Sequence, residues 1–72
     1  PMRVLIVDDD KEFVHLLKLF ISKHEELKVK GGYTGASALE VLKNEFVDIL
    51  LLGLALSDID GLALQLDLAG LD

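Results

Sequence analysis

Three consecutive carboxylates, Asp8, Asp9 and Asp10, follow directly on an apolar run at residues 4–7. Carboxylate oxygens are the ligands that Mg²⁺ and Ca²⁺ prefer in proteins, so such a cluster can form part of a cation site. One of the three acids has a simpler role, because Asp is a good N-cap and is favoured at the start of a helix. We assign that role to Asp10. A helix cap requires only one carboxylate, and three carboxylates close together repel one another. Capping therefore does not explain Asp8 and Asp9, and these two residues are candidate site residues.

The place of these acids in the fold follows from the strand that precedes them. A short, uninterrupted apolar run such as residues 4–7 predicts a strand buried on both faces, in a mostly parallel sheet covered by helices. In sheets of this kind, ligands bind outside the carboxyl ends of the strands. Residues 47–52 predict a second strand of the same type, which ends at Gly53. A glycine within a strand costs roughly 0.5–1 kcal/mol relative to alanine, so strand stability does not explain Gly53.

An amphipathic helix and an edge strand are predicted between these two strands. Residues 11–24 place apolar side chains on one helical face at a spacing of three and four residues: Phe13, Leu16, Leu17, Phe20 and Ile21. Residues 27–30 alternate as a half-exposed edge strand does, and their two lysines discourage pairing with another chain. The glycines of residues 31–35 are assigned to a turn.

A second helix follows this turn. Thr34 is one candidate for its cap, and Ser37 with Glu40 offers a capping box slightly later in the chain. The apolar side of this helix is expected to contain Ala38, Leu39, Leu42 and Phe46.

The last segment, residues 62–72, fits two structures. Leu62, Leu66 and Ala69 fall at helical spacing, and Asp60 could cap such a helix. The leucines at even positions also alternate as in a strand, so a hairpin that turns at residues 58–60 is the competing interpretation. We favour the helix, with leucine around most of its circumference and burial on more than one side.

Composition excludes several classes of function. The chain of 72 residues allows one small domain, and its formal net charge of -6 argues against nucleic-acid binding. The longest apolar run, residues 49–56, is too short to cross a bilayer, so no membrane partner is expected. The absence of cysteine fits a cytoplasmic location and excludes a disulfide. Because 51% of the residues are hydrophobic, we expect burial against a further surface.

In this order of strands and helices, the motifs resemble the receiver domain of two-component response regulators. Residues 4–10 resemble its opening, residues 29–39 its second strand and helix, and residues 48–61 its third strand and the following loop. The resemblance implies a three-layer, flavodoxin-like (CheY-like) α/β fold, βαβαβα with parallel strands in the order 2-1-3. It implies one receiver-like domain over residues 1–72, corresponding to the N-terminal three-fifths of the five-unit family fold.

The resemblance also implies a chemistry, in which an aspartate receives a phosphoryl group with the help of Mg²⁺. Asp8 and Asp9 match the metal-binding acidic pair, with Asp9 favoured as the direct ligand. Ala55 matches the position whose backbone carbonyl completes the metal site, and Asp60 with Gly61 matches the closing Asp-Gly turn.

The departures from the family pattern decide the expected function. Gly53 stands where the family has its phosphoaccepting aspartate, and without that nucleophile no acyl phosphate can form there. Ser57 replaces the usual proline, and the family's hydroxyl residue and lysine belong to units that follow the third. We therefore expect a Mg²⁺ site that is weak or vestigial, no enzymatic activity, and no other cofactor.

Two functions remain open on this basis. The first is a receiver-like module of phosphorelay signal transduction that is not phosphorylated and acts by self-association or by binding a protein partner. The alternative is a truncated or engineered receiver fragment with no function beyond folding and dimerising.

Self-association is expected at the third strand, which is central in the family order 2-1-3-4-5. Its hydrophobic edge has no partner on one side and invites another chain, most simply in a symmetric homodimer. The candidate interface residues are leucines of this strand, its following loop and the last segment: Leu50, Leu52, Leu54, Leu56, Leu62, Leu64, Leu66 and Leu68.

Overall fold

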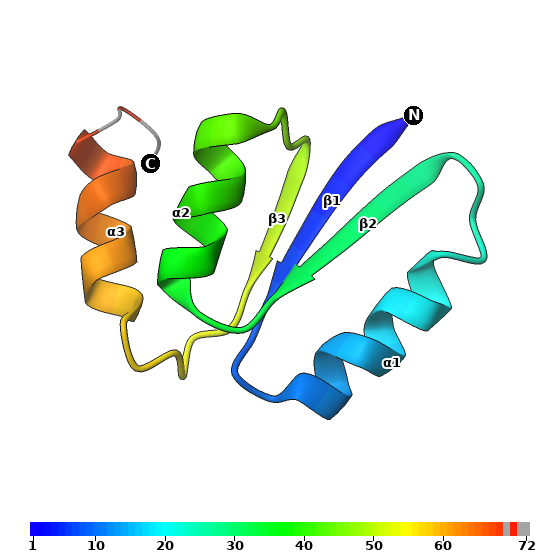
Figure 1. Ribbon diagram of the computed structural model, residues 1–72, viewed down its shortest axis with the longest axis horizontal. Helices are drawn as coiled ribbons and strands as arrows, with labels where there is room; N and C mark the ends of the chain where they lie inside the picture. The colour runs from blue at the N-terminus through cyan, green and yellow to red at the C-terminus, as the bar shows by residue number, and fades with distance from the viewer. Residues whose placement is uncertain (69, 71–72) are drawn as a thin grey trace.

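Strands and helices alternate along the chain in a computed structural model that describes residues 1–68 and 70. The strands are β1 (Met2–Val7), β2 (Leu27–Gly32) and β3 (Ile49–Leu52), and the helices are α1 (Lys11–Ile21), α2 (Gly35–Asn44) and α3 (Ile59–Leu68). The strand order is β2-β1-β3, and both neighbouring pairs are parallel (Figure 1). The predicted order and direction of the strands are therefore confirmed.

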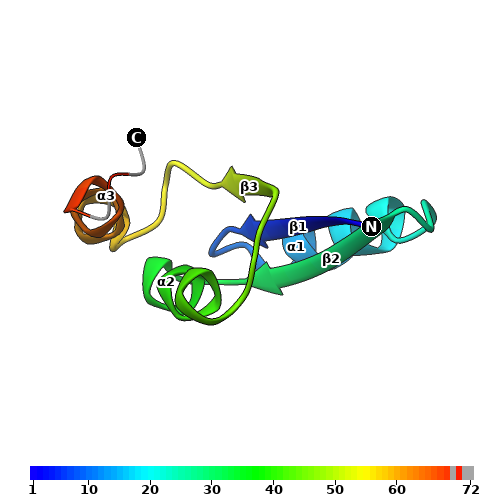
Figure 2. The same ribbon diagram turned by 90° about the horizontal axis from the view of Figure 1, so that it is seen from above.

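The sheet carries a helix layer on each face. Successive side chains of a strand point to opposite faces, and in β1 they divide between two clusters. Val4 and Ile6 pack with Val14 of α1, whereas Leu5 and Val7 pack against residues of α2 and α3. Figure 2 shows α2 and α3 together at one end of the molecule, with α1 alongside β1 and β2. The three-layer α/β architecture is confirmed.

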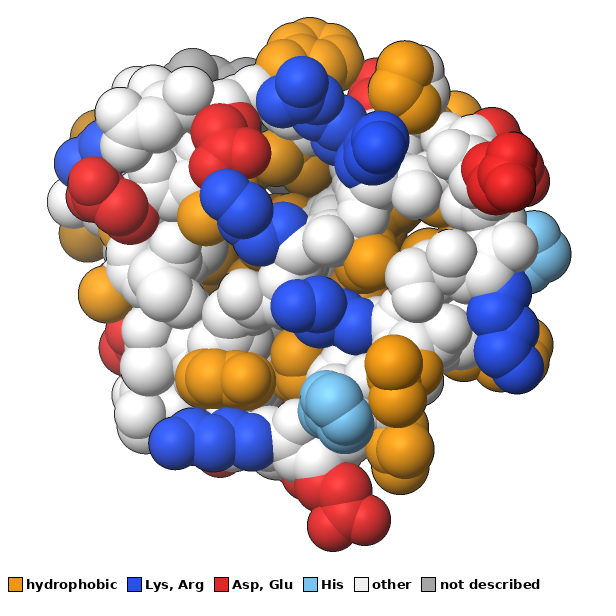
Figure 3. Space-filling view, turned by 45° about the vertical axis from the view of Figure 1, so that its right-hand side comes forward, with side chains coloured by type: hydrophobic (Ala, Val, Ile, Leu, Met, Phe, Trp, Pro, Cys, Tyr) orange, Lys and Arg blue, Asp and Glu red, His pale blue; other side chains and the backbone are white. Residues whose placement is uncertain are grey.

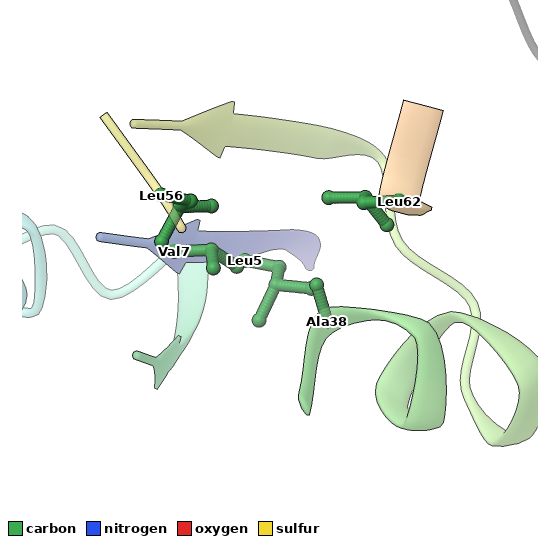
Figure 4. Packing of buried hydrophobic residues seen from close by; sticks show 5 residues of the cluster. All are labelled: Leu5, Val7, Ala38, Leu56 and Leu62. Atoms are coloured by element: carbon green, nitrogen blue, oxygen red, sulfur yellow. The ribbon is translucent and has the colours of Figure 1, made fainter. Parts of the chain in front are cut away.

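The larger core cluster lies between β1 and the layer formed by α2 and α3. It consists of Leu5, Val7, Ala38, Leu56 and Leu62 (Figure 4). Residues 4–7 have exposed fractions between 0% and 5%, so the predicted burial of β1 on both faces is confirmed. Burying each leucine side chain fully contributes roughly 1.5–3 kcal/mol.

Helix α1 buries a different stripe from the one predicted. Its fully buried residue is Val14, which the prediction omitted, and Leu17 and Ile21 extend the contact with the sheet. The helix ends at Ile21 and not at His24. Helix α1 packs on β1 and β2 through Val14, Leu17 and Ile21. The rest of its apolar face lies outside this contact. Three residues predicted to be buried are therefore 49%, 56% and 64% exposed, namely Phe13, Leu16 and Phe20.

Strand β2 is an edge strand, as predicted, but it extends to Gly32. Gly31 and Gly32 are therefore strand residues, and assigning them to a turn was wrong. A Cβ atom added at Gly31 would lie 2.7 Å from Cγ1 of Val14. Glycine at position 31 thus permits the close approach of α1 to the sheet.

Thr34 begins α2 through a capping box with Ser37. The Thr34 hydroxyl accepts a hydrogen bond from the Ser37 backbone N–H (3.0 Å), and the Ser37 hydroxyl accepts one from the Thr34 N–H (3.3 Å). The alternative capping box of Ser37 with Glu40 is therefore wrong. The helix ends at Asn44, so Phe46 lies beyond it and is 73% exposed. Including Phe46 in the apolar side of this helix was also wrong.

Strand β3 is shorter and less buried than predicted. It begins at Ile49, which leaves residues 47–48 outside the strand. Leu50 and Leu52 pack against the larger core cluster, but Ile49 and Leu51 are 39% and 42% exposed on the face that carries α1. Within the described residues, β3 therefore buries one face, and the prediction of two buried faces was wrong.

The last segment is a helix, so the hairpin alternative is wrong. Helix α3 begins at Ile59, which places Asp60 inside the first turn and not at the cap. Leu62 is 2% exposed and Leu64 is 58% exposed, so burial is confined to one side. Ala69, Leu71 and Asp72 of the predicted segment lie outside the described residues. Among the described residues, no helix has the length and apolar character needed to span a membrane.

Candidate functional site

The carboxyl ends of β1 and β3 bring Asp8 and Gly53 together. Val7 and Leu52 are register partners at the ends of two parallel strands, so the next residue of each strand lies at the same edge of the sheet. The Gly53 backbone N–H donates a hydrogen bond of 2.7 Å to the Val7 carbonyl, which extends the ladder by one residue. Of the three consecutive acids, Asp8 therefore lies beside Gly53.

The Asp8 carboxylate occupies the space beside Gly53. Its Oδ1 accepts a hydrogen bond of 2.9 Å from the Asp10 backbone N–H. Its Oδ2 lies 2.5 Å from the position that a Cβ atom on residue 53 would take. Any side chain at residue 53 would therefore require Asp8 to turn away, and the missing side chain of Gly53 is what gives Asp8 this position.

Asp10 has the structural role assigned to it. It is the N-cap of α1, and its Oδ1 accepts a hydrogen bond of 3.0 Å from the Phe13 backbone N–H. Asp9 is exposed and no hydrogen bond to its side chain is present among the described residues. Of the three consecutive acids, Asp10 stabilises a helix end, Asp8 faces Gly53, and Asp9 faces solvent.

The predicted cation ligands Asp8, Asp9 and Ala55 follow the carboxyl ends of β1 and β3. Asp8 is partly buried, whereas Asp9 and Ala55 are exposed in the loops that follow β1 and β3. Within residues 1–68 and 70, no three Asp, Glu, His or Cys side chains gather so that they could hold a metal ion. Mg²⁺ usually keeps several waters and uses one or two protein carboxylates. Asp8, Asp9 and the Ala55 carbonyl therefore suit Mg²⁺ chemically, but one Asp8 oxygen already accepts a hydrogen bond from Asp10.

Asp58 has a role that the sequence did not indicate. It precedes α3, but its carboxylate accepts hydrogen bonds from the backbone N–H groups of Gly35 (2.8 Å) and Ala36 (3.0 Å) at the start of α2. These two donors hold the pKa of Asp58 below its ordinary value, with that of Gly35 the larger cause. Asp58 thus ties the loop after β3 to α2 across 23 residues of sequence. A single-sequence pattern contains no signal for a cap from so distant a residue.

The structure divides the eight candidate interface leucines into three groups. Leu56 and Leu62 are 4% and 2% exposed, so they belong to the core and are not accessible to a partner. Leu50, Leu52 and Leu66 are partly buried against that core. The remaining three are 88%, 58% and 73% exposed, and they are Leu54, Leu64 and Leu68.

An apolar hollow adjoins the acidic edge on the face that carries α1. It has a volume of about 350 Å³ and lies between α1 and β3. Phe13 and Leu17 of α1 form one wall, Leu51 of β3 forms the other, and Asp8 and Gly53 close one end. The walls of this hollow are apolar, and Gly53 at its end has no side chain that could act as a nucleophile.

Comparison with known proteins identifies a family pattern over nearly the whole chain. The family model described as the response regulator receiver domain matches residues 4–72. The regulatory protein VanRc of Enterococcus gallinarum is 36% identical over 62 residues, which cover 86% of this chain and 26% of that protein. The chain therefore spans about a quarter of the length of this curated relative. No solved structure gave a significant match.

Proposed function

This chain belongs to the family of response regulator receiver domains of two-component signalling, and on that premise we propose that it is a receiver module that is not itself phosphorylated. In this proposal it acts by associating with a second copy of itself and not by catalysis. The observation that carries the proposal is Gly53, at the end of β3, with the Asp8 carboxylate in the space beside it.

The loss of phosphorylation follows from the absence of a suitable nucleophile. An aspartyl phosphate needs a carboxylate at the acceptor position, and Gly53 has no side chain. Asp58 is the nearest substitute in the loop after β3, but both its oxygens accept hydrogen bonds from the start of α2. Asp8, Asp9 and the Ala55 carbonyl would hold a Mg²⁺, which would supply positive charge to a phosphoryl group. We propose that its binding is weak, because one Asp8 oxygen already accepts a hydrogen bond from the Asp10 backbone N–H.

Self-association is proposed at the outer edge of β3. Among the described residues, β3 pairs only with β1, so its other edge presents unpaired backbone N–H and C=O groups. The four residues of β3 include no charge and no proline, whereas the opposite edge strand β2 contains Lys28 and Lys30. Charged residues and proline are the usual protection of an edge strand, so β3 is the less protected edge.

A two-fold axis perpendicular to the sheet would pair β3 with its counterpart in an antiparallel direction. The same patch then contributes from both copies, as an isologous interface requires. The exposed side chains of Ile49 and Leu51 would meet those of the partner on the face that carries α1. The exposed α1 residues Phe13 and Leu16 lie on this face too, so the pairing would cover part of them.

The experiment is the mass in solution, measured by light scattering on a sizing column over a range of concentrations. We expect a dimer for the natural chain, with and without a small-molecule phosphodonor and Mg²⁺. Leu51→Lys places a charge at the β3 edge and should give a monomer. Leu64→Lys changes an exposed leucine of α3 (58% exposed) and serves as the matched control that remains dimeric. A monomer at all concentrations, or dissociation by Leu64→Lys in place of Leu51→Lys, would contradict the β3 interface.

A further inference from the structure

A second hollow, the basic pocket, lies at the end of the sheet opposite to Asp8 and Gly53. It is formed by the first residues of β1 and β2 on one side, and by the end of α2 and the loop to β3 on the other. Its volume is about 240 Å³. This is below the range of about 300–1,000 Å³ that is typical of sites for drug-sized ligands, so it suits a small molecule.

The inner surface of the basic pocket is apolar. Leu5 of β1 and Val41 of α2 line it, together with Val47 of the loop before β3. Phe46 also lines the pocket, and its side chain is 73% exposed. An aromatic ring so exposed is costly in water and gains stability when a ligand covers it. The pocket therefore offers an apolar contact to the body of a ligand.

The rim of the basic pocket is positively charged in an otherwise acidic protein. Arg3, Lys28 and Lys30 line it, which is three of the seven Lys and Arg residues of the chain. Among the described residues, Glu45 is the only acidic residue in its lining, and it pairs with Lys30. Within the part of the chain that the structure describes, Arg3 and Lys28 form no ion pair.

The spatial distribution of charge agrees with this description. Figure 3, which brings forward the side of the molecule that carries α1 and β2, shows basic side chains interspersed with apolar ones. Most of the acidic side chains visible in this view lie toward the outline, and one lies among the basic side chains. Long basic side chains keep their charged ends in water while their stems cover apolar surface, so Arg3 and Lys28 can reach an anion at the mouth of the pocket.

We propose that the basic pocket binds a small amphiphilic carboxylate, whose apolar body contacts Phe46, Val41 and Val47 and whose carboxylate pairs with Arg3 and Lys28. Two observations carry the proposal independently. The first is the exposed aromatic ring beside an apolar hollow, and the second is the pair of basic side chains, Arg3 and Lys28, which form no ion pair among the described residues. The nearby Asp48 carboxylate accepts a hydrogen bond of 2.7 Å from the backbone N–H of Arg3 and not from its side chain. Hydrogen bonds between such cations and a carboxylate are charge-assisted and therefore stronger than those between neutral groups. The pocket lies far along the strands from Gly53, so this inference does not depend on the proposed function.

The test uses octanoate as the probe, with octanol and octylammonium as probes of equal chain length and different charge. Binding is followed through the backbone amide resonances of the full chain. We expect octanoate to shift the amides of residues 28–30 and 45–47 in a saturable manner, octanol to bind more weakly, and octylammonium to leave them unchanged. Arg3→Gln and Lys28→Gln should each weaken octanoate binding about two- to fivefold, the size expected for an exposed ion pair.

Two controls make the result decisive. Lys11→Gln makes the same change of charge at the start of α1, at the opposite end of the sheet, and should leave the affinity for octanoate unchanged. A synthetic peptide of residues 59–68, which is acidic and rich in leucine, represents α3 of a second copy as the competing occupant. The proposal is overturned if octanoate gives no saturable shift, if octylammonium binds as well, or if Lys11→Gln weakens binding as much as Lys28→Gln. Binding of the peptide in the absence of octanoate binding would overturn it in favour of a second copy.

Discussion

The close approach of α1 to β2 predicts that alanine in place of glycine lowers stability at Gly31 and raises it at Gly61. In Gly31→Ala, the new Cβ would lie 2.7 Å from Cγ1 of Val14 and 2.9 Å from Cδ of Lys18. The Lys18 stem can move aside, but Val14 is 0% exposed and has no room to retreat. Overpacking of this kind typically costs 1–3 kcal/mol, so we expect the free energy of unfolding to fall by about 2 kcal/mol.

Gly61→Ala is the matched control. Gly61 lies in α3, is exposed, and has no heavy atom within 4 Å of an added Cβ. Alanine is favoured over glycine by about 0.8–1.0 kcal/mol in a helix interior and by less in the first turn, where Gly61 lies. This variant should therefore be somewhat more stable than the unsubstituted chain. Urea denaturation followed by circular dichroism measures both changes. For a domain of this size each kcal/mol shifts Tm by about 4–8 °C.

A double-substitution cycle identifies the cause of the Gly31 effect. Val14→Ala removes the methyl group that the new Cβ would meet, so Gly31→Ala should cost much less in that background than in the natural chain. If Gly31→Ala destabilises equally with and without Val14→Ala, the close approach of α1 is not the reason for the glycine. Equal effects of the alanine substitutions at Gly31 and Gly61 would refute the reasoning altogether.

Three further predictions concern the acidic edge and the loop after β3. The pKa of Asp58 is lowered in the folded state, so its contribution to stability is present above the ordinary value of 3.8 and is lost as the pH falls through the lower folded pKa. Asp58→Asn should therefore have a lower Tm than the unsubstituted chain at neutral pH, and the difference in Tm should shrink as the pH falls below 3.8. A difference in Tm that does not change with pH would exclude the ionic contact with α2. Gly53→Ala displaces the Asp8 carboxylate with its hydrogen bond to Asp10, and it brings the new Cβ to 3.3 Å from the Val7 carbonyl oxygen. It should cost about 1 kcal/mol, and less in an Asp8→Ala background. Millimolar Mg²⁺ should raise Tm only slightly, and a large increase that Asp9→Ala abolishes would show that the cation site is strong.

The elements that the sequence predicted well are those specified by local pattern. The apolar run of β1 specified a strand buried on both faces, and Asp10 at the start of an amphipathic stretch specified an N-cap. The order of the strands followed from the family resemblance, which the family match over residues 4–72 supports. Asp8 and Gly53 could be placed at one edge because the carboxyl ends of parallel strands coincide there.

The errors arose where tertiary contacts decide the outcome. Hydrophobic spacing could not show which half of the apolar face of α1 meets the sheet, and Val14 is buried because Gly31 lies opposite it. The continuous apolar run of β3 gave no sign that Ile49 and Leu51 would be exposed, since that depends on which helix covers the strand. Asp58 accepts hydrogen bonds from the start of a helix 23 residues away, which depends on the path of a loop and not on local sequence.

The measurement that tests the central claim most directly is the intact mass of the chain after incubation with a small-molecule phosphodonor and Mg²⁺, beside a phosphorylatable receiver domain as the positive control. Gly53 has no carboxylate, and the Asp58 oxygens accept hydrogen bonds from the start of α2. We therefore expect the mass of this chain to remain unchanged while the control gains a phosphoryl group. A mass increase of one phosphoryl group that hydroxylamine removes would reveal an aspartyl phosphate and contradict the account.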